Sequence, residues 1–372
     1  MKDNFVEEYS IEELRTIKDT FYKELVDANS GKTTSIPFLI HTLPHSSILN
    51  PDELFQTITI GGSVFKTALF QNTPNGPHLL KEQESPIPVF STADIFFSFL
   101  LSHLYPDVSH VAINFAFPVS PVIKEEVLDG ILLHGTKEHL FEGLVGLPVG
   151  NALSDYICTY NQRRIVCTLA NDTICLLLSA SQPDTWLKTV TGVIGTGTNY
   201  ALTLNAEKAV NLECGAFNKF RQTDTGKIID AESNNPGTQL IEKEIAGAYL
   251  WKHYNATIQK YNLTLLLIES TGELSELAED ENSQASSIAQ SLLIRSASLA
   301  ASQIGGIVQF KKNLGLKEPL HFIIEGSLFW KGWEYKKHVE NYLKEIGMEQ
   351  DVVFEPFSHR SIEGAVRLLI PK

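Results

Sequence analysis

The segment "GVIGTGTNYAL" (residues 192–202) interleaves glycine and threonine between an apolar run and an asparagine. A dinucleotide fingerprint needs G-x-G-x-x-G or G-x-G-x-x-A after a strand, but the third position here is Tyr200. A Walker loop needs G-x-x-x-x-G-K-[ST], and that string does not occur in the chain. Taken alone, the segment predicts either a phosphate-binding turn or a plain turn between two strands.

The same kind of pattern occurs earlier in the chain. The segment "LFQTITIGGSVFKTALFQ" (residues 54–71) alternates around Gly61 and Gly62, which is typical of a β-hairpin. Each glycine hairpin is followed by alternating helix and strand patterns, which favours two α/β domains of similar plan with a ligand cleft at the strand ends. Ser10 and Glu13 form a capping-box pattern that predicts an opening helix. Residues 238–253 are expected to form one long helix, and Glu269–Ser287 is the most linker-like stretch.

Composition excludes some classes of partner. The 372 residues carry a net charge of -14, which argues against nucleic acid because phosphate neutralisation needs clustered Lys and Arg. The four cysteines show no C-x-x-C pair and no metal-ligand spacing, so they are expected to be free thiols. The amino-terminal residues contain no apolar signal region, and no apolar run is expected to span a bilayer. These features predict a cytoplasmic protein without a membrane partner.

Three carboxylates are candidates for chemistry. Asp172 lies at a strand-to-helix junction, where it is either a helix cap or a general base for a hydroxyl nucleophile. Glu213 ends a predicted strand, and Glu242 lies in the helix that follows Pro236. Glu242 is either an ordinary solvated charge or a ligand of polyol hydroxyls.

These stretches together resemble the hexokinase family. The string "NDT" (171–173) is similar to the family's catalytic segment, "GTGTNYAL" (195–202) to its "GTGTNACY" turn, and "LECGAFN" (212–218) to its "MEWGAFG". The longest match is "DAESNNPGTQLIEKEIAGAYLWK" (230–252), and "RSASLAASQIGGIV" and "IIEGSLFWKGWEYKKHVENYL" resemble two further family segments. The six matches occur in the family's order over most of the chain.

The resemblance implies a fold, a reaction and a set of residues. The fold would be two actin-like (ribonuclease H-like) α/β domains with an interdomain cleft: a small domain of residues 54–171 plus about 360–372, and a large domain of residues 1–50 plus 172–357. The activity would be phosphorylation of glucose or a related hexose at its 6-hydroxyl, with ATP and Mg²⁺, in glycolysis. The chain would be a monomer or homodimer.

The resemblance also assigns roles to residues of this sequence. Asp172 would be the catalytic base, and Lys137 would assist transfer of the phosphoryl group. The sugar would be bound by Thr136, Lys137, Asn171, Asp172, Asn199, Glu213 and Glu242. ATP would be bound by Gly61, Gly62, Ser63, Gly195, Thr196, Gly197, Thr198, Gly326 and Ser327, with Ser361 near the adenosine.

The sequence also departs from the family pattern. The family's first phosphate turn reads "DLGGTNFR", but here it reads "TIGGSVFK", so Thr59 replaces the Asp that helps to hold hydrated Mg²⁺. The family's "FSFP" is "FAFP", with Ala116 in place of a sugar-contacting Ser, and Cys214 replaces a Trp. Two alternatives therefore remain: an active hexokinase, or a catalytically weak or inactive relative that binds sugar as a sensor. An actin-like assembly ATPase is disfavoured because it would not need the sugar-type carboxylates.

Overall fold

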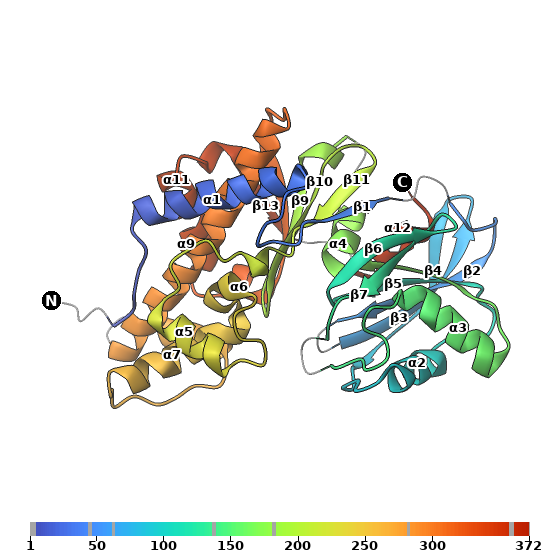
Figure 1. The fold of residues 1–372 in the computed structure, drawn as a ribbon, viewed down its shortest axis with the longest axis horizontal. Helices are drawn as coiled ribbons and strands as arrows, with labels where there is room; N and C mark the ends of the chain where they lie inside the picture. Colours follow the sequence, from blue (N-terminus) through green and yellow to red (C-terminus); the bar gives the residue numbers. More distant parts are fainter. Residues whose placement is uncertain are drawn as a thin grey trace. The chain divides into compact units, whose positions relative to one another are not determined.

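The computed structural model describes residues 5–43, 47–61, 64–135, 139–180, 184–280, 283–356 and 361–371. It consists of two compact units, each built from several stretches of chain (Figure 1). Unit 1 comprises residues 1–38, 190–200 and 212–357, and unit 2 comprises residues 39–189, 201–211 and 358–372. The structure thus groups residues 172–189 with the chain that precedes them, whereas the family-based domain boundaries remain a prediction.

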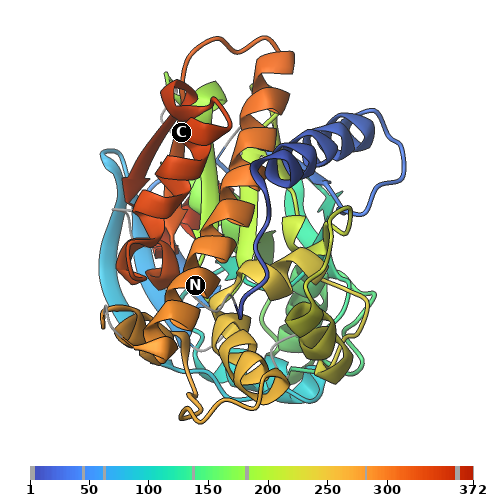
Figure 2. The same cartoon turned by 90° about the vertical axis from the view of Figure 1, so that its left-hand side faces the viewer.

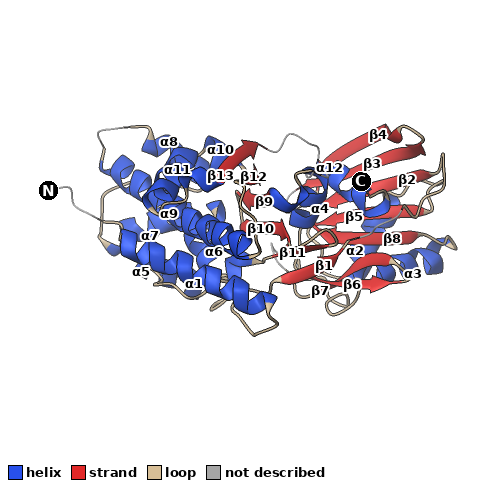
Figure 3. Ribbon diagram, turned by 90° about the horizontal axis from the view of Figure 1, so that it is seen from above, coloured by secondary structure: helices blue, strands red, loops and turns tan. Residues whose placement is uncertain are grey.

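Unit 1 is mainly helical (Figure 3). Its helices are α1 (Ile11–Asn29), α5 (Asp224–Glu232), α6 (Leu240–Ile245), α7 (Gly247–Lys260), α8 (Thr271–Ala278), α9 (Gln284–Asn313), α10 (Ser327–Lys331) and α11 (Tyr335–Glu345). Its strands are β9 (Thr189–Ile194), the first part of β10 (Thr198–Thr203), β12 (Leu320–Glu325) and β13 (Val352–Pro356), with β12 and β13 parallel. The predicted opening helix is confirmed, because the Ser10 side chain and Glu13 form a capping box at the start of α1.

The long helix α9 forms the core of unit 1, and α1 packs along it (Figure 2). It is long and apolar enough to cross a membrane, contrary to the expectation from the sequence. However, 89% of its most apolar window is buried inside the structure, as in the central helix of a globular domain.

Two other sequence predictions in unit 1 are wrong. The helix expected over residues 238–253 is broken at Ala246, which has extended backbone angles, so α6 and α7 are separate helices. The stretch expected to be a linker contains α8, whose N-cap Ser270 accepts a hydrogen bond from Glu273 N. Leu274 and Ala278 of α8 are buried, so this polar stretch still has an apolar face.

Unit 2 contains a five-stranded sheet in the order β4-β3-β2-β5-β8. Its strands are β1 (Leu39–Thr42), β2 (Leu54–Ile60), β3 (Val64–Thr73), β4 (Gly76–Pro86), β5 (His110–Phe115), β6 (Val119–Lys124), β7 (Val127–Leu132), β8 (Val166–Asn171) and β11 (Lys208–Asn211). Its helices are α2 (Ala93–Ser102), α3 (Val149–Asn161), α4 (Asp172–Ala180) and α12 (Ser361–Leu369). The predicted hairpin of residues 54–71 is confirmed as the antiparallel pair β2 and β3.

The alternation of side chains along the strands explains how this sheet is covered. In β5, Ile113 belongs to the apolar cluster that includes α2 and α3, whereas Ala112 belongs to the cluster that includes α4 and α12. Successive side chains of a strand point to opposite faces, so the sheet is buried on both sides. A further, six-stranded sheet has the order β1-β11-β10-β9-β12-β13, and the division into units falls within β10 after Tyr200.

Candidate functional site

The predicted hairpin around Gly195 is a turn between β9 and β10 that α7 supports. Gly195 N donates to Gly197 O at 3.0 Å, while the carbonyls of Gly195 and Thr196 accept from Gly247 N at 2.8 Å and Ala248 N at 3.2 Å. Within the described part of the chain, the N–H groups of Thr196 and Gly197 make no hydrogen bond. Consecutive unbonded N–H groups in a turn form a concavity suited to an anion.

Close backbone packing explains the glycines of this turn. A Cβ on Gly195 would lie 3.2 Å from the Gly326 Cα atom, and a Cβ on Gly326 would overlap the Ile194 carbonyl. Gly326 has φ of 129°, a conformation that side chains disfavour, and Ser327 then begins α10. The structure therefore brings the predicted phosphate residues of unit 1, Gly195–Thr198, Gly326 and Ser327, together.

The predicted sugar-binding groups of unit 1 lie directly beside this turn. Glu242 Oε1 accepts a hydrogen bond from Thr198 N at 3.1 Å. Asn199 Oδ1 accepts from Tyr200 N at 2.8 Å and from Cys214 N at 3.3 Å, which fixes the orientation of the amide. Glu213, which precedes Cys214, has φ of 50°, a strained conformation for a residue with a side chain and one often found at functional sites.

The residues that hold these groups in place were not predicted from the sequence. A Cβ on Gly215 would lie 3.0 Å from Glu242 Cβ and 2.5 Å from Gln239 Oε1, so a larger residue would displace the Gln239 side chain and crowd Glu242. A Cβ on Gly247 would lie 2.9 Å from the Gly195 carbonyl. The only signal was a glycine inside each matched segment. Burial raises the pKa of the Cys214 thiol well above its usual value, which keeps the thiol neutral.

In unit 2, the candidate residues lie at the carboxyl ends of three parallel strands of the five-stranded sheet. Strands β2, β5 and β8 are parallel, with Ile60 opposite Phe115 and Phe115 opposite Asn171. The residues that follow these strands are therefore neighbours: Gly61, Ala116 and Asp172. Ligands of open α/β sheets bind at such carboxyl ends of strands.

Asn171, rather than Asp172, has the capping role at this junction. Asn171 Oδ1 accepts from Thr173 N at 3.0 Å and from Thr173 Oγ1 at 2.6 Å. Asp172 is the first residue of α4, is partly exposed, and accepts from Thr173 N at 2.8 Å. The expectation that Asp172 caps the helix is therefore wrong, because Asn171 precedes α4 and its side chain caps it. A carboxylate in the first turn of a helix is stabilised in its ionised form by the helix dipole.

Thr59 occupies the position where the family has an Asp. Its Oγ1 atom is buried and makes no hydrogen bond within the described residues. The described residues contain no group of three or more His, Cys, Asp or Glu side chains that could hold a metal ion. These residues do not form a protein cage for Mg²⁺, which in kinases is held largely by substrate phosphates and water.

Some predicted residues cannot be placed. Gly62, Ser63, Thr136 and Lys137 lie outside the described residues, and Ser361 begins α12 without a described side chain. Their roles remain predictions.

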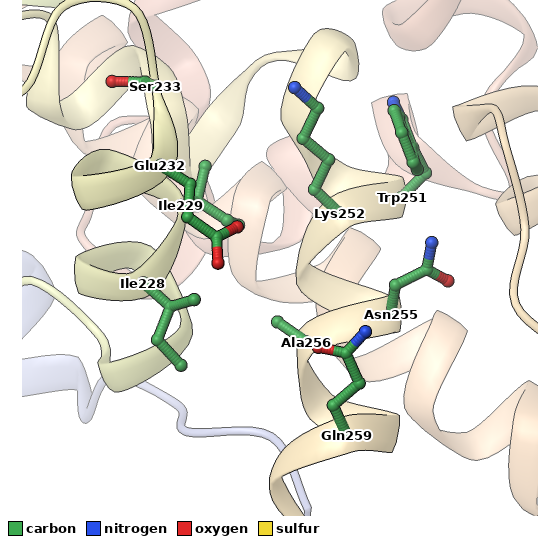
Figure 4. A pocket seen from close by; sticks show the side chains of 9 residues that line it. All are labelled: Ile228, Ile229, Glu232, Ser233, Trp251, Lys252, Asn255, Ala256 and Gln259. Carbon is green, nitrogen blue, oxygen red and sulfur yellow. The ribbon is translucent and has the colours of Figure 1, made fainter.

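A pocket of about 290 Å³ lies between α5 and α7 in unit 1 (Figure 4). Ile228, Ile229 and Glu232 come from α5 and Trp251, Lys252 and Asn255 from α7. The Asn255 amide is already hydrogen-bonded, because Nδ2 donates to the Ile268 carbonyl and Oδ1 accepts from Ile268 N. None of the predicted site residues that the structure describes lines this pocket.

Comparison with known proteins connects these features to one family. The family model described as hexokinase matches residues 189–261 and 253–369. Hexokinase-2, chloroplastic, of Nicotiana tabacum is 29% identical over 245 residues, which cover 57% of this chain and 48% of that protein. The hexokinase of Kluyveromyces lactis is 27% identical over 274 residues, covering 65% of this chain and 56% of the yeast protein. The chain is therefore similar to hexokinases in sequence. It spans about half the length of the curated relatives that it matches.

Solved hexokinase structures share the fold of this chain. A Schistosoma mansoni hexokinase complexed with glucose has a TM-score of 0.75 at 17% identity, with 97% of this chain and 95% of that chain covered. A second hexokinase crystal structure has a TM-score of 0.73 at 20% identity and covers 97% of this chain and 96% of that chain. The predicted fold class, with two α/β domains of the hexokinase type, is confirmed.

Proposed function

We propose that this chain is an ATP-dependent hexose kinase that phosphorylates the 6-hydroxyl of glucose or a related hexose. The observation that carries the proposal is the cluster in unit 1 where Glu242 and Asn199 adjoin the glycine turn. An anion-binding turn next to hydroxyl-binding side chains is the combination that a sugar kinase needs. The match to hexokinases along residues 189–369 supports the same conclusion.

The proposed roles follow from the resemblance and from the geometry of each unit by itself. Asp172 accepts the proton of the sugar 6-hydroxyl while the hydroxyl oxygen forms a bond to the γ-phosphorus of ATP. The bond from that phosphorus to the oxygen that bridges it to ADP breaks, and ADP leaves. Glu242, Glu213, Asn199 and Asn171 bind the other hydroxyls, together with Thr136 and Lys137.

The phosphate side uses mainly backbone groups. The N–H groups of Thr196 and Gly197 hold phosphate oxygens beside Gly326 and Ser327, and Gly61, Gly62 and Ser63 do so in unit 2. Lys137 balances negative charge on the transferred group. Mg²⁺, carried in with ATP, would neutralise charge on the β- and γ-phosphates.

The proposed setting follows from the proposed reaction. A hexose 6-phosphate is a substrate of glycolysis, and we place the protein in the cytoplasm as a monomer or homodimer.

A second candidate function has an observation of its own. Thr59 provides a neutral, buried hydroxyl where the family has a carboxylate, which favours a sugar-binding sensor with weak or no turnover. The two functions share the sugar site and differ in phosphoryl transfer.

A coupled assay with ATP and Mg²⁺ separates the candidates. Glucose, fructose and mannose are supplied in turn, and ADP release and hexose binding are both measured. A kinase releases ADP only when a hexose is present, whereas a sensor binds the hexose without hexose-dependent ADP release. If no hexose is bound or phosphorylated, both proposals are wrong.

A further inference from the structure

The helix that carries Glu242 is too short to be stable alone. Helix α6 has six residues, and isolated helices below about 12–15 residues are marginal in water. Its position must therefore come from contacts with its surroundings. Successive residues of a helix point in directions about 100° apart. Contacts made by Lys243 and Glu244 on two sides of α6 consequently fix the direction in which Glu242 points.

Glu244 is held by a buried polar cluster. Its side chain is completely buried, and its carboxylate accepts from Thr223 N at 2.8 Å and from Thr223 Oγ1 at 2.9 Å. Arg295 of α9 lies 3.3 Å from the other carboxylate oxygen. His253 of α7, 3.8 Å from that same oxygen, donates through Nε2 to the Lys243 carbonyl at 2.9 Å. The cluster thus connects α6 to α7, α9 and the start of α5.

Lys243 is held on another side of α6. Its side chain is also fully buried, and Nζ donates to Asp230 Oδ1 at 2.5 Å, Ser233 Oγ at 2.9 Å and the Asn235 carbonyl at 3.0 Å. The Ile245 carbonyl at the end of α6 accepts from Ser296 Oγ at 2.7 Å. Buried charges that have several specific partners allow one geometry and penalise others.

We infer that Glu244 and Lys243 are positioning residues for sugar binding. They fix α6 so that Glu242 Oε1 meets Thr198 N beside Asn199, although neither residue belongs to the proposed sugar-binding set. Hexose affinity then depends on a charge cluster behind the site. This inference rests on the proposed function, because it assumes that Glu242 binds the sugar.

A double-mutant cycle with glucose as the probe tests the inference. Glucose Kd is measured by calorimetry without nucleotide for wild type, Glu244→Gln, Glu242→Gln and the double variant. Glu244→Gln keeps the shape of the side chain but removes its charge, and should raise Kd about tenfold, within the range of coupling between contacting residues. In the Glu242→Gln background the same change should alter Kd less than about twofold.

Glu24→Gln is the matched control. Glu24 is also buried in unit 1, where it accepts from Ser35 N, but it lies on α1. This variant should lower Tm like Glu244→Gln and leave the glucose Kd unchanged. If Glu244→Gln does not fold, Lys243→Met carries the same prediction.

The outcomes distinguish the inference from the function on which it rests. Wild-type affinity in Glu244→Gln, or an equal loss in both backgrounds, overturns the positioning role alone. Wild-type affinity in Glu242→Gln overturns the proposed sugar role of Glu242, and the positioning role with it. An equal loss of affinity in Glu24→Gln would show that Glu244 acts only through general stability.

Discussion

The candidate residues of unit 1 and those of unit 2 are held in different ways. In unit 1, the Ile194 carbonyl excludes a side chain at Gly326, and Glu242 accepts a hydrogen bond from the turn itself. In unit 2, the candidates follow the ends of three parallel strands, and a Cβ on Gly61 would lie 3.0 Å from the Val64 carbonyl. Of the departures from the family pattern, those at Thr59 and Ala116 fall in unit 2 and that at Cys214 falls in unit 1. The comparison indicates that direct contacts fix Glu242, the proposed sugar-binding carboxylate, whereas the register of the parallel strands positions the candidates of unit 2.

The largest expected effect comes from unit 2. Asp172→Ala removes the proposed base at the start of α4 and should lower kcat by about 10²–10⁴. Thr173 N still has the Asn171 side chain as an acceptor, so the fold should remain intact. Turnover is measured in a coupled assay, with circular dichroism as the check on folding. Wild-type turnover would remove Asp172 from the mechanism.

A pair of glycine variants measures the difference in backbone packing. Gly326→Ala imposes a side chain at φ of 129° against the Ile194 carbonyl, and should lower the free energy of unfolding by about 2–4 kcal/mol. Gly61→Ala meets a milder contact without a positive φ, and should cost less than about 1 kcal/mol. Urea unfolding of both variants gives the comparison. Equal losses would show that the two turns are equally constrained.

One buried histidine from each unit, His41 and His253, has a lowered pKa that can be tested. Burial lowers the pKa of His41 in unit 2 to about 4, and burial together with the Arg295 charge lowers that of His253 in unit 1 to about 4. Unfolding raises each pKa toward about 6.5, so the unfolded chain binds more protons and stability falls as pH drops from 6.5 towards 4.

Because each histidine takes up a proton on unfolding, each should lower the free energy of unfolding by about 2 kcal/mol as the pH falls from 7 to 5. Urea unfolding at the two pH values measures this loss, and His41→Asn and His253→Asn should each reduce it. A pH dependence that is identical in wild type and both variants would contradict the assignment.

The smallest expected effect concerns Thr59. Thr59→Asp places a carboxylate where the Thr59 hydroxyl makes no hydrogen bond within the described residues. It should raise kcat about tenfold, or lower the Mg²⁺ concentration needed for half-maximal rate about tenfold. Steady-state rates over a range of Mg²⁺ concentrations check this, with Thr59→Asn as the uncharged control. If both variants match a brisk wild-type enzyme, the account of this departure is wrong.

The sequence predicted the elements better than their contacts. The glycine hairpins and the Asn171–Asp172 junction were visible because turn residues and hydrophobic alternation are local signals. The break between α6 and α7 was not predicted, because Gly247 is the only weak helix former in "EKEIAGAY" and its hydrogen bond to the Gly195 carbonyl joins segments that are distant in the sequence. The buried cluster around Glu244 was also hidden, because a Glu is ordinarily expected at the surface and its partners come from distant helices.

The most direct test of the central claim is hexose binding in the absence of nucleotide. The claim is that unit 1 retains the sugar-binding carboxylate, whatever the changes at Thr59 do to phosphoryl transfer. Thermal denaturation should show wild type and Thr59→Asp stabilised by glucose alike, by about 2.7 kcal/mol at 100 times the wild-type Kd, and Glu242→Gln stabilised less at the same glucose concentration. If glucose at any soluble concentration fails to stabilise wild type, or stabilises Glu242→Gln equally, the claim is contradicted.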